Sequence, residues 1–225
     1  MNGIRKLLKL MEKNFRVLNI KLLKEIILTI ISTIFIGFGV CIFIECRLGS
    51  DTITVFLDGM HRTFDIPVSV VDQILTIVIF ILAILVNRKK VGISSVVNVL
   101  FIGVSIGIAE KIIVPMKIYE YSFIIRFIFV WIAQIFFCAS YALMQTLDSG
   151  MGTFDAVIYS VKERFNLKYI TVRTMFDLTY VIVGVMLGGR VGIGTVVSLV
   201  TTGLITSFFY NLYTRKVFAR NSVSS

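Results

Sequence analysis

Long runs of apolar residues dominate the chain and alternate with short polar stretches. Six runs are long enough to cross the hydrocarbon core of a bilayer as helices, which takes about 20 residues. They are Ile26–Ile44, Val68–Val86, Ile93–Val114, Tyr121–Leu147, Ile170–Leu187 and Ile193–Tyr213. The pattern therefore predicts an all-α, polytopic membrane protein with six transmembrane helices.

Two further segments, Asp51–Thr63 and Thr153–Phe165, are mixed in polarity and follow glycine-containing turns. A helix rises about 1.5 Å per residue, so each segment would extend only about 20 Å, less than the roughly 30 Å hydrocarbon core. Ser50 or Asp51 is a suitable N-cap for the first segment. We therefore expect two short re-entrant or interfacial half-helices that do not cross the membrane.

One pattern occurs twice in the chain. Val91–Gly103 reads VGISSVVNVLFIG and Val191–Gly203 reads VGIGTVVSLVTTG, so the repeat period is roughly 100 residues. A duplication of this length is typical of membrane folds built from two halves. Three crossings in each half is an odd number, so the two three-helix repeats are predicted to be inverted relative to each other.

The composition and charge agree with a membrane protein. The chain is 57% hydrophobic and 16% charged, whereas soluble domains are about 45–50% apolar and 25% charged. We attribute the net charge of +10 to the positive-inside rule rather than to nucleic-acid binding, because basic residues gather at the ends of the spans. This rule places both termini and the Arg88–Lys90 loop in the cytoplasm. If the half-helices crossed, that loop would lie outside.

Residues 1–24 form the first of four predicted regions. Their leucines recur at spacings of three and four with lysine and arginine between them, which predicts a basic amphipathic helix on an anionic membrane surface. A basic tail that only sets the topology explains the same pattern. Residues 25–117 and 118–213 are the two membrane repeats, and residues 214–225 are a cytoplasmic tail.

Polar residues near the starts of the half-helices and in the repeated motif form the candidate site. Inverted-repeat transporters place ligands near the bilayer midplane, where broken helix ends point at them, and helix N-termini favour anions. The candidate substrate-binding residues are Gly49, Ser50, Asp51, Thr54, Gly150, Gly152, Thr153, Asp155, Asn98 and Ser198. Capped turns and interhelical hydrogen bonds would explain the same residues.

Ionisable residues inside the apolar segments are the second source of candidates. Asp155 is an acid at membrane depth and is therefore a candidate proton or cation site, although it also suits the dipole at a helix N-terminus. Arg173 and Asp177 are one helical turn apart and are expected to pair with each other. Asp72 and Gln73 are polar positions that would face the same cavity.

Motifs of enzymes and metal sites are absent from the sequence. His61 is the single histidine, and the three cysteines lie in or beside apolar stretches without a C-x-x-C pair, which argues against a metal site. The sequence also lacks H-E-x-x-H, G-x-S-x-G and a phosphate-binding loop with its lysine. We therefore expect no enzymatic activity, no cofactor and no metal.

The stretches Gly49–Gly59, Val91–Ser94, Gly152–Asp155 and Val191–Thr195 carry a family resemblance. They are similar to segments of the bacterial YczE/YyaS/YitT family of integral membrane proteins, over most of residues 25–213. Thr52 and Thr54 stand where the first family motif tends to have proline and aspartate, whereas Asp155 keeps the acid of the second. The resemblance implies a multi-pass protein of the bacterial plasma membrane, in a family whose role is largely unassigned.

These observations favour a small-solute transporter or permease with a midplane site between the repeats. A channel-like pore and a non-transporting subunit or accessory factor of a larger complex are the alternatives. The expected partners are the lipid bilayer and a small molecule whose identity the sequence does not give. The spacing of Gly103 and Gly107 also allows a homodimer, although it suits internal helix packing equally well.

Overall fold

The computed structural model describes the backbone of residues 2–147 and 149–223, and the side chains of residues 20–147 and 149–215. Eight α-helices make up the described fold, and no strand occurs in it. They are α1 (Asn2–Cys46), α2 (Thr52–Phe64), α3 (Val68–Asn87), α4 (Ile93–Ile113), α5 (Phe123–Gln145), α6 (Thr153–Phe165), α7 (Tyr169–Met186) and α8 (Ile193–Val223). The predicted all-α class is confirmed.

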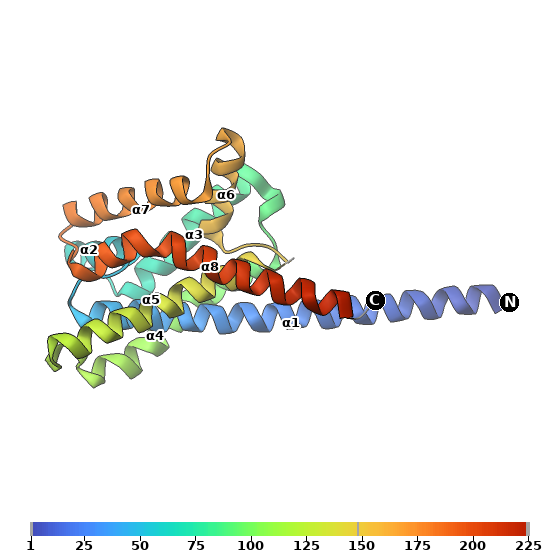
Figure 1. Cartoon of the computed structure of the whole chain (residues 1–225), viewed down its shortest axis with the longest axis horizontal. Coiled ribbons are helices and arrows are strands. Elements are labelled where there is room, and N and C mark those ends of the chain that lie inside the picture. Colours follow the sequence, from blue (N-terminus) through green and yellow to red (C-terminus); the bar gives the residue numbers. More distant parts are fainter. Residues whose placement is uncertain (1, 148, 224–225) are drawn as a thin grey trace.

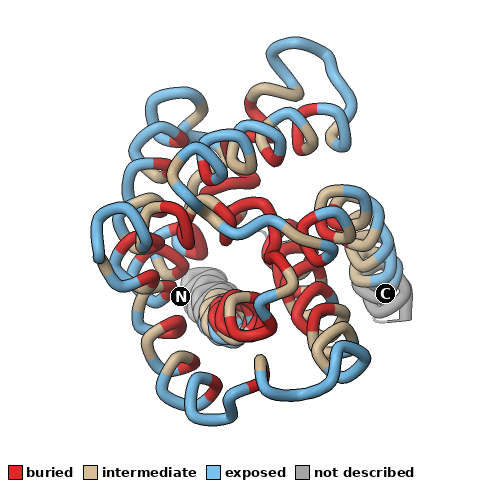
Figure 2. Tube along the Cα trace, turned by 90° about the vertical axis from the view of Figure 1, so that its left-hand side faces the viewer, coloured by how far each residue is buried: buried red, intermediate tan, exposed pale blue. Residues whose placement is uncertain are grey.

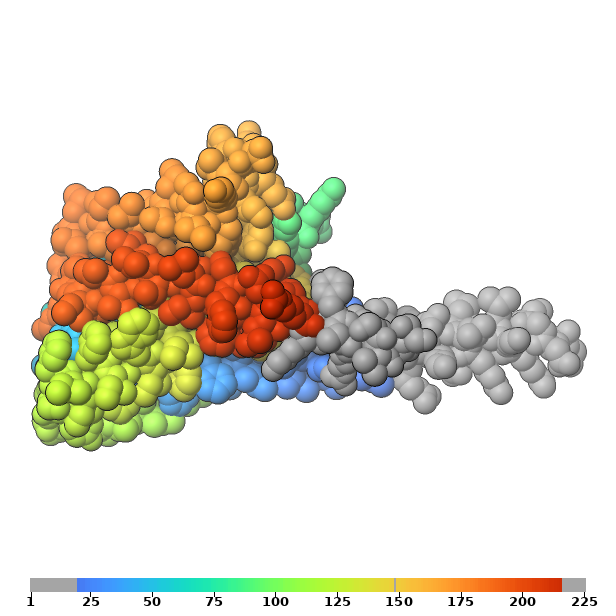
Figure 3. Space-filling view, viewed as in Figure 1, coloured from blue at the N-terminus to red at the C-terminus, as the bar shows by residue number. Residues whose placement is uncertain are grey.

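Six of these helices, α1, α3, α4, α5, α7 and α8, are long and apolar enough to cross a membrane. Figure 1 shows them side by side along the long axis of the molecule, with the start of α1 and the end of α8 toward the same side. Helix α1 packs against α4 and α5. Helix α8 packs against α5 and α7 and lies between them on the face shown in Figure 3.

Helix α1 runs without interruption from Asn2 to Cys46. Within the described side chains, Ile20–Cys46 is long and apolar enough to cross a membrane, and it includes the predicted span Ile26–Ile44. The predicted amphipathic segment, residues 1–24, falls mostly on residues 1–19, whose side chains lie outside the description. Its placement on the membrane surface therefore stays a prediction.

The short helices α2 and α6 have nearly the predicted bounds and lie toward opposite ends of the bundle (Figure 1). In each, the N-terminal half is buried and the last residue, Phe64 or Phe165, is exposed. Helix α2 packs against α7, and α6 packs against α3. Both short helices therefore enter the bundle with their N-terminal ends.

The glycine-containing motifs pair across the two halves of the chain. Gly49, before α2, lies against Gly192, before α8, whereas Gly150, before α6, lies against Gly92, before α4. Hydrogen bonds join the same turns, from Gly194 N to Leu48 O (2.8 Å) and from Ser94 N to Ser149 O (3.1 Å). These contacts join the start of α2 to the start of α8 and the start of α6 to the start of α4.

Glycines within the spanning helices differ in how closely they approach a neighbouring helix. Gly37 of α1 lies so close to α4 that a Cβ atom there would be 2.7 Å from the carbonyl carbon of Ser105. Gly103 packs against Gln73 of α3, but a Cβ atom at Gly107 would meet open space. The G-x-x-x-G pattern of α4 is therefore used at only one of its two glycines within the chain.

The exposed surface is largely apolar, and charged residues occur in the interior. Large apolar side chains such as Leu85 (75% exposed) and Met186 (81% exposed) face outward. Figure 2 shows buried positions on the inner sides of the helices and exposed positions around the outside. This distribution suits a protein surrounded by lipid, and it draws attention to the few charges that are buried.

Candidate functional site

Arg173 of α7 lies at the centre of a buried polar network and is only 3% exposed. Its Nε atom is 3.2 Å from Oδ2 of Asp177, one helical turn further along α7, so the predicted pair is present. Its Nη1 atom is 3.8 Å from Oδ1 of Asp155 on α6. The guanidinium carbon also lies 5.4 Å from the centre of the Tyr141 ring on α5, so Arg173 connects three helices.

Helix α2 reaches the same network with its first turn. The hydroxyl group of Thr52 donates a hydrogen bond of 2.7 Å to Oδ1 of Asp177. Asp51, the N-cap, accepts hydrogen bonds on Oδ2 from the backbone N–H groups of Ile53 (3.1 Å) and Thr54 (3.3 Å). The starts of both short helices therefore meet at Arg173 and Asp177, because Asp155 lies in the first turn of α6.

Asp155 is completely buried and is held from two helices. The hydroxyl group of Tyr169 donates to its Oδ1 atom (3.0 Å), and the Gln145 side chain donates to the Tyr169 oxygen (3.1 Å). Its second oxygen, Oδ2, is buried without a hydrogen-bond partner among the described residues. Burial raises the pKa of Asp155 above its usual range, with Arg173 acting in the opposite direction.

A second carboxyl group without full partners lies on α3. Asp72 is buried, and its Oδ2 atom and the hydroxyl group of Thr76 have no hydrogen-bond partner within the described part of the chain. Both line a cavity of about 10 Å³ together with Asn98 and Tyr141, which is room for about one water molecule. Asp72 and Asn98 therefore face one cavity, whereas Gln73 bonds to α4 instead.

We call these five residues the buried ionic cluster: Asp51, Asp72, Asp155, Arg173 and Asp177. Each is at most 5% exposed. The cluster holds four carboxyl groups and one guanidinium group, so full ionisation would leave three uncompensated negative charges in the interior. Burying unpaired charge is costly, so protons, a bound cation or the N-terminal dipoles of α2 and α6 offset part of this charge.

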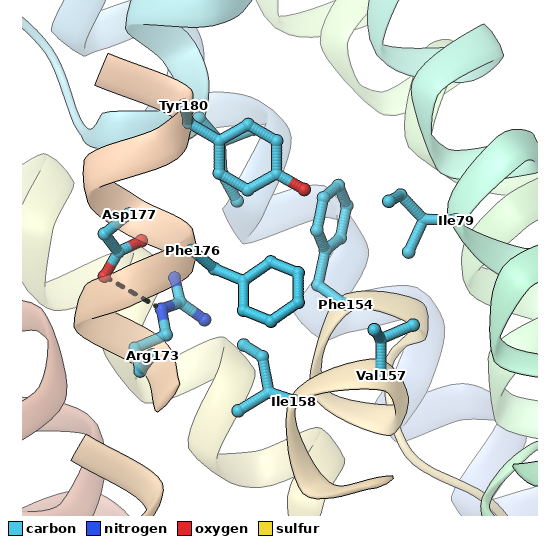
Figure 4. Close-up of a pocket in the computed structure, with 9 residues that line it drawn as sticks. Ile79, Phe154, Val157, Ile158, Arg173, Phe176, Asp177 and Tyr180 are labelled. Carbon is cyan, nitrogen blue, oxygen red and sulfur yellow. Dashed lines mark hydrogen bonds and ion pairs between the residues drawn. The ribbon is translucent and has the colours of Figure 1, made fainter. Parts of the chain in front are cut away.

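Figure 4 shows the space beside Arg173 and Asp177, where Phe176 and Tyr180 of α7 face Phe154 of α6 and Ile79 of α3. This cavity also measures only about 10 Å³. The ring of Tyr180 lies 6.1 Å from that of Phe154, centre to centre, and 6.0 Å from that of Phe56. Aromatic side chains thus close the space around the cluster, and the structure is occluded there.

Gly49 and Ser50 line a larger pocket of about 140 Å³ beside α2. Thr54 donates its hydroxyl hydrogen to Asp51, so it supports the cap. Gly150 packs on Gly92, and Gly152 lies beside the Met144 side chain. Thr153 is buried with its hydroxyl group unpartnered among the described residues.

Asn98 forms a hydrogen bond between helices and Ser198 forms one within its own helix. Interhelical hydrogen bonds were the alternative to substrate binding for these two residues. Asn98 donates to the Thr33 hydroxyl group (3.2 Å), which joins α4 to α1. Ser198 and Thr202 of α8 share a 3.0 Å hydrogen bond, and Gln134 of α5 donates to Thr202 (3.0 Å). Ser198 therefore belongs to a polar contact between α5 and α8 rather than to the buried ionic cluster.

Sequence reasoning missed Tyr141, Gln145 and Tyr169 as parts of the network. Tyr169 lies four residues before Arg173 and eight before Asp177, so it shares their helix face; this spacing was an available signal. Gln145 ends α5 and lies beside both Tyr169 and Asp155. No local pattern marks it.

The fold and its buried charges define a polytopic helical membrane protein of an uncharacterised family. The sequence pattern of DUF6198, a family of unknown function, matches residues 23–211, and the chain belongs to this family. It is also similar to an uncharacterized protein of Haemophilus influenzae (strain ATCC 51907 / DSM 11121 / KW20 / Rd), with 27% identity over 194 residues, 85% of this chain and 86% of the relative. No solved structure matches the chain. Neither match names the YczE/YyaS/YitT family, so that finer assignment stays a prediction.

Proposed function

We propose that the protein is a small-solute transporter whose central site is the buried ionic cluster. The observation that carries this proposal is the meeting of the N-terminal turns of α2 and α6 at Arg173 and Asp177. Ionisable groups inside a membrane bundle mark substrate or ion pathways by default. Broken or short helices whose N-termini point at the centre of the bundle are the usual site-forming elements of transporters.

The exchange of contacts between the two halves supports a two-fold relation between the repeats, and the positions of α2 and α6 toward opposite ends of the bundle (Figure 1) support an inverted arrangement. Helix α2 of the first half packs on α7 of the second, and α6 of the second packs on α3 of the first. The sequence register makes α6 the counterpart of α2 and α7 the counterpart of α3. A pseudo-two-fold axis requires this reciprocity, and the pairs Gly49–Gly192 and Gly92–Gly150 follow the same rule.

We further propose that the start of α1 and the end of α8 face the cytoplasm of a bacterium. The Arg88–Lys90 turn and the basic residues between Lys162 and Lys168 lie toward that end of the bundle (Figure 1). An excess of lysine and arginine on one side is the mark of the cytoplasmic face. On this proposal, the α2 end faces outward.

The cavities favour a transporter over a pore. A pore needs a continuous path, but the two described cavities that touch the cluster hold about 10 Å³ each. The pocket beside α2 holds about 140 Å³, and a pocket between α1, α5 and α8 holds about 210 Å³. A closed centre between wider pockets is expected when access alternates between the two sides.

Uptake into liposomes tests the proposal. The purified full chain is reconstituted and screened with a panel of radiolabelled amino acids, carboxylates, amines and sugars, with and without a proton gradient. Asp155→Asn should abolish most uptake of any transported solute, since it removes a proton-binding carboxyl group. Tyr169→Phe, which removes one hydroxyl group from the network, should reduce uptake less.

Asp65→Asn is the matched control, because Asp65 is exposed at the end of α2 and asparagine also tolerates its left-handed backbone (φ 54°). This variant should transport like the wild type. Uptake that is unchanged in folded Asp155→Asn protein would refute a role of the cluster. Activity only in the presence of a co-purifying protein would favour the accessory-subunit alternative.

A further inference from the structure

The pocket beside α2 is a second polar site, distinct in position from the buried ionic cluster. It measures about 140 Å³ and lies between the end of α1, the turn before α2, α2 itself and the segment after α7. Its charged lining residues are Glu45, Arg47, Asp58, Arg62 and Arg190. The turn Gly49–Ser50 also lines it and leads directly to Asp51 of the cluster.

The pocket has more positive than negative charge available to a ligand. Arg62 donates through Nε to both oxygens of Asp58 (2.9 Å each), and Asp58 also accepts from the backbone N–H of Arg190 (2.9 Å). Asp58 is therefore fully engaged. The Arg190 side chain has no hydrogen bond or ion pair with any described residue, and the Arg47 guanidinium carbon lies 3.8 Å from the centre of the Tyr119 ring.

Glu45 adds the opposite charge to the same pocket and is close enough to Arg47 for the two charges to attract each other. It is only 9% exposed, and its Oε1 atom is buried without a hydrogen-bond partner among the described residues. An unpartnered carboxylate oxygen in the wall of a pocket needs a donor. The pocket therefore offers surplus guanidinium groups and one carboxylate that is free to accept.

The α6 end of the bundle lacks the excess of positive charge found in the pocket beside α2. In the register of the repeats, Lys90 corresponds to Arg190 and Glu163 corresponds to Arg62. Lys90 and Glu163 bind each other at 2.6 Å, so the charges there are neutralised internally. At the α2 end, Arg62 pairs with Asp58 instead. Arg190, which corresponds to Lys90, has no acidic side-chain partner among the described residues and leaves its positive charge for a ligand.

We propose that this pocket binds a small zwitterion, such as an α-amino acid, with its carboxylate toward the arginines and its ammonium group toward Glu45. A simple anion would leave Glu45 without a donor, and a simple cation would face the guanidinium groups of Arg47 and Arg190. The inference rests on the proposed transport function, to which it adds a substrate class and the end from which the substrate enters.

Thermal shift measurements on the purified full chain in detergent test this assignment with three probes. L-alanine carries both charged groups, propionate lacks the ammonium group, and ethylamine lacks the carboxylate. L-alanine should stabilise the protein with saturable binding, and the other two should bind at least about 10-fold more weakly, because each leaves a charged pocket group without a partner.

Two variants assign the groups. Glu45→Gln should weaken L-alanine binding at least about 10-fold and remove the preference over propionate. Arg190→Gln, at an exposed position, should weaken L-alanine and propionate together and is not expected to perturb folding. Lys117→Gln, exposed and paired only with Glu120 (3.4 Å) in the part described, should bind like the wild type.

Equal binding of L-alanine and propionate, or no saturable binding of L-alanine, would overturn the zwitterion assignment. Neither result would overturn the transport function, because liposome uptake of another solute that depends on Asp155 would still support it. Conversely, if L-alanine binds but no solute is taken up, the pocket is a zwitterion site and the transport proposal is refuted.

Discussion

Gly49 in the turn before α2 packs backbone to backbone against Gly192 at the start of α8. A Cβ atom added to Gly49 would collide with the Gly192 backbone and would lie 2.7 Å from the Thr195 hydroxyl oxygen. Gly49 also has a φ of 87°, a conformation that other residues adopt at a cost. This contact sets the depth at which α2 begins and therefore the position of Asp51 and Thr52.

Gly49→Ala is accordingly expected to destabilise the protein by roughly 2 to 5 kcal/mol, the sum of the left-handed backbone and over-packing effects. Gly107→Ala is the matched control, because a Cβ atom there meets open space. Thermal unfolding of the purified variants, followed by size-exclusion chromatography, measures both. Equal stability of the two variants would mean that the Gly49–Gly192 contact is looser than described.

Replacing Arg173 alone should lower the stability of the protein more than replacing Arg173 and Asp177 together. Arg173→Leu leaves Asp155 and Asp177 buried without their shared cation, and removing one member of a buried pair typically costs about 3–5 kcal/mol. In the double variant Arg173→Leu/Asp177→Leu, part of this loss should be recovered. Thermal unfolding of the single and double variants tests the coupling, and strictly additive losses would contradict it.

The fold could be predicted in detail because its signals are local. Apolar run length identified the six spans, and insufficient length identified α2 and α6. The pair Arg173–Asp177 followed from helical spacing. These features depend on neighbouring residues along one helix, which the sequence displays directly.

The assembled site could not be predicted to the same extent. Nothing local indicates that Gly49 meets Gly192 rather than the equivalent Gly150, because this choice depends on how the halves pack. The same packing brings Gln145 and Tyr169 to Asp155. Asn98 and Ser198 occupy equivalent positions in the repeated motif. Asn98 shares a cavity with Asp72 of the cluster, whereas Ser198 contacts Thr202, which bonds to Gln134.

The stability of the protein should depend on pH through Asp155. Its surroundings are Arg173, Asp177 and Tyr169 from α7 and Gln145 from α5. Because burial raises the folded-state pKa, the unfolded chain loses its proton first as pH rises through the usual carboxyl range near 4. The folded state then loses stability until the higher folded-state pKa is passed.

Asp155→Asn should therefore flatten this pH dependence, since asparagine cannot titrate. Thermal unfolding midpoints of the wild type and Asp155→Asn between pH 4 and pH 7 provide the measurement, with Asp65→Asn as the control that keeps the wild-type slope. A wild-type midpoint that rises over the same range, with a steeper rise than in Asp155→Asn, would show that Asp155 is held ionised by Arg173.

The orientation of the bundle is open to direct chemical labelling, because the three native cysteines, Cys41, Cys46 and Cys138, are buried. A membrane-impermeant maleimide should leave them unmodified in the folded protein.

Lys89→Cys and Lys117→Cys introduce single thiols at opposite ends of the bundle, at exposed positions after α3 and after α4. If the positive-inside rule holds here, intact bacterial cells should label Lys117→Cys, and Lys89→Cys should react only after permeabilisation. The reverse labelling pattern would invert the proposed orientation and place the pocket beside α2 on the cytoplasmic side.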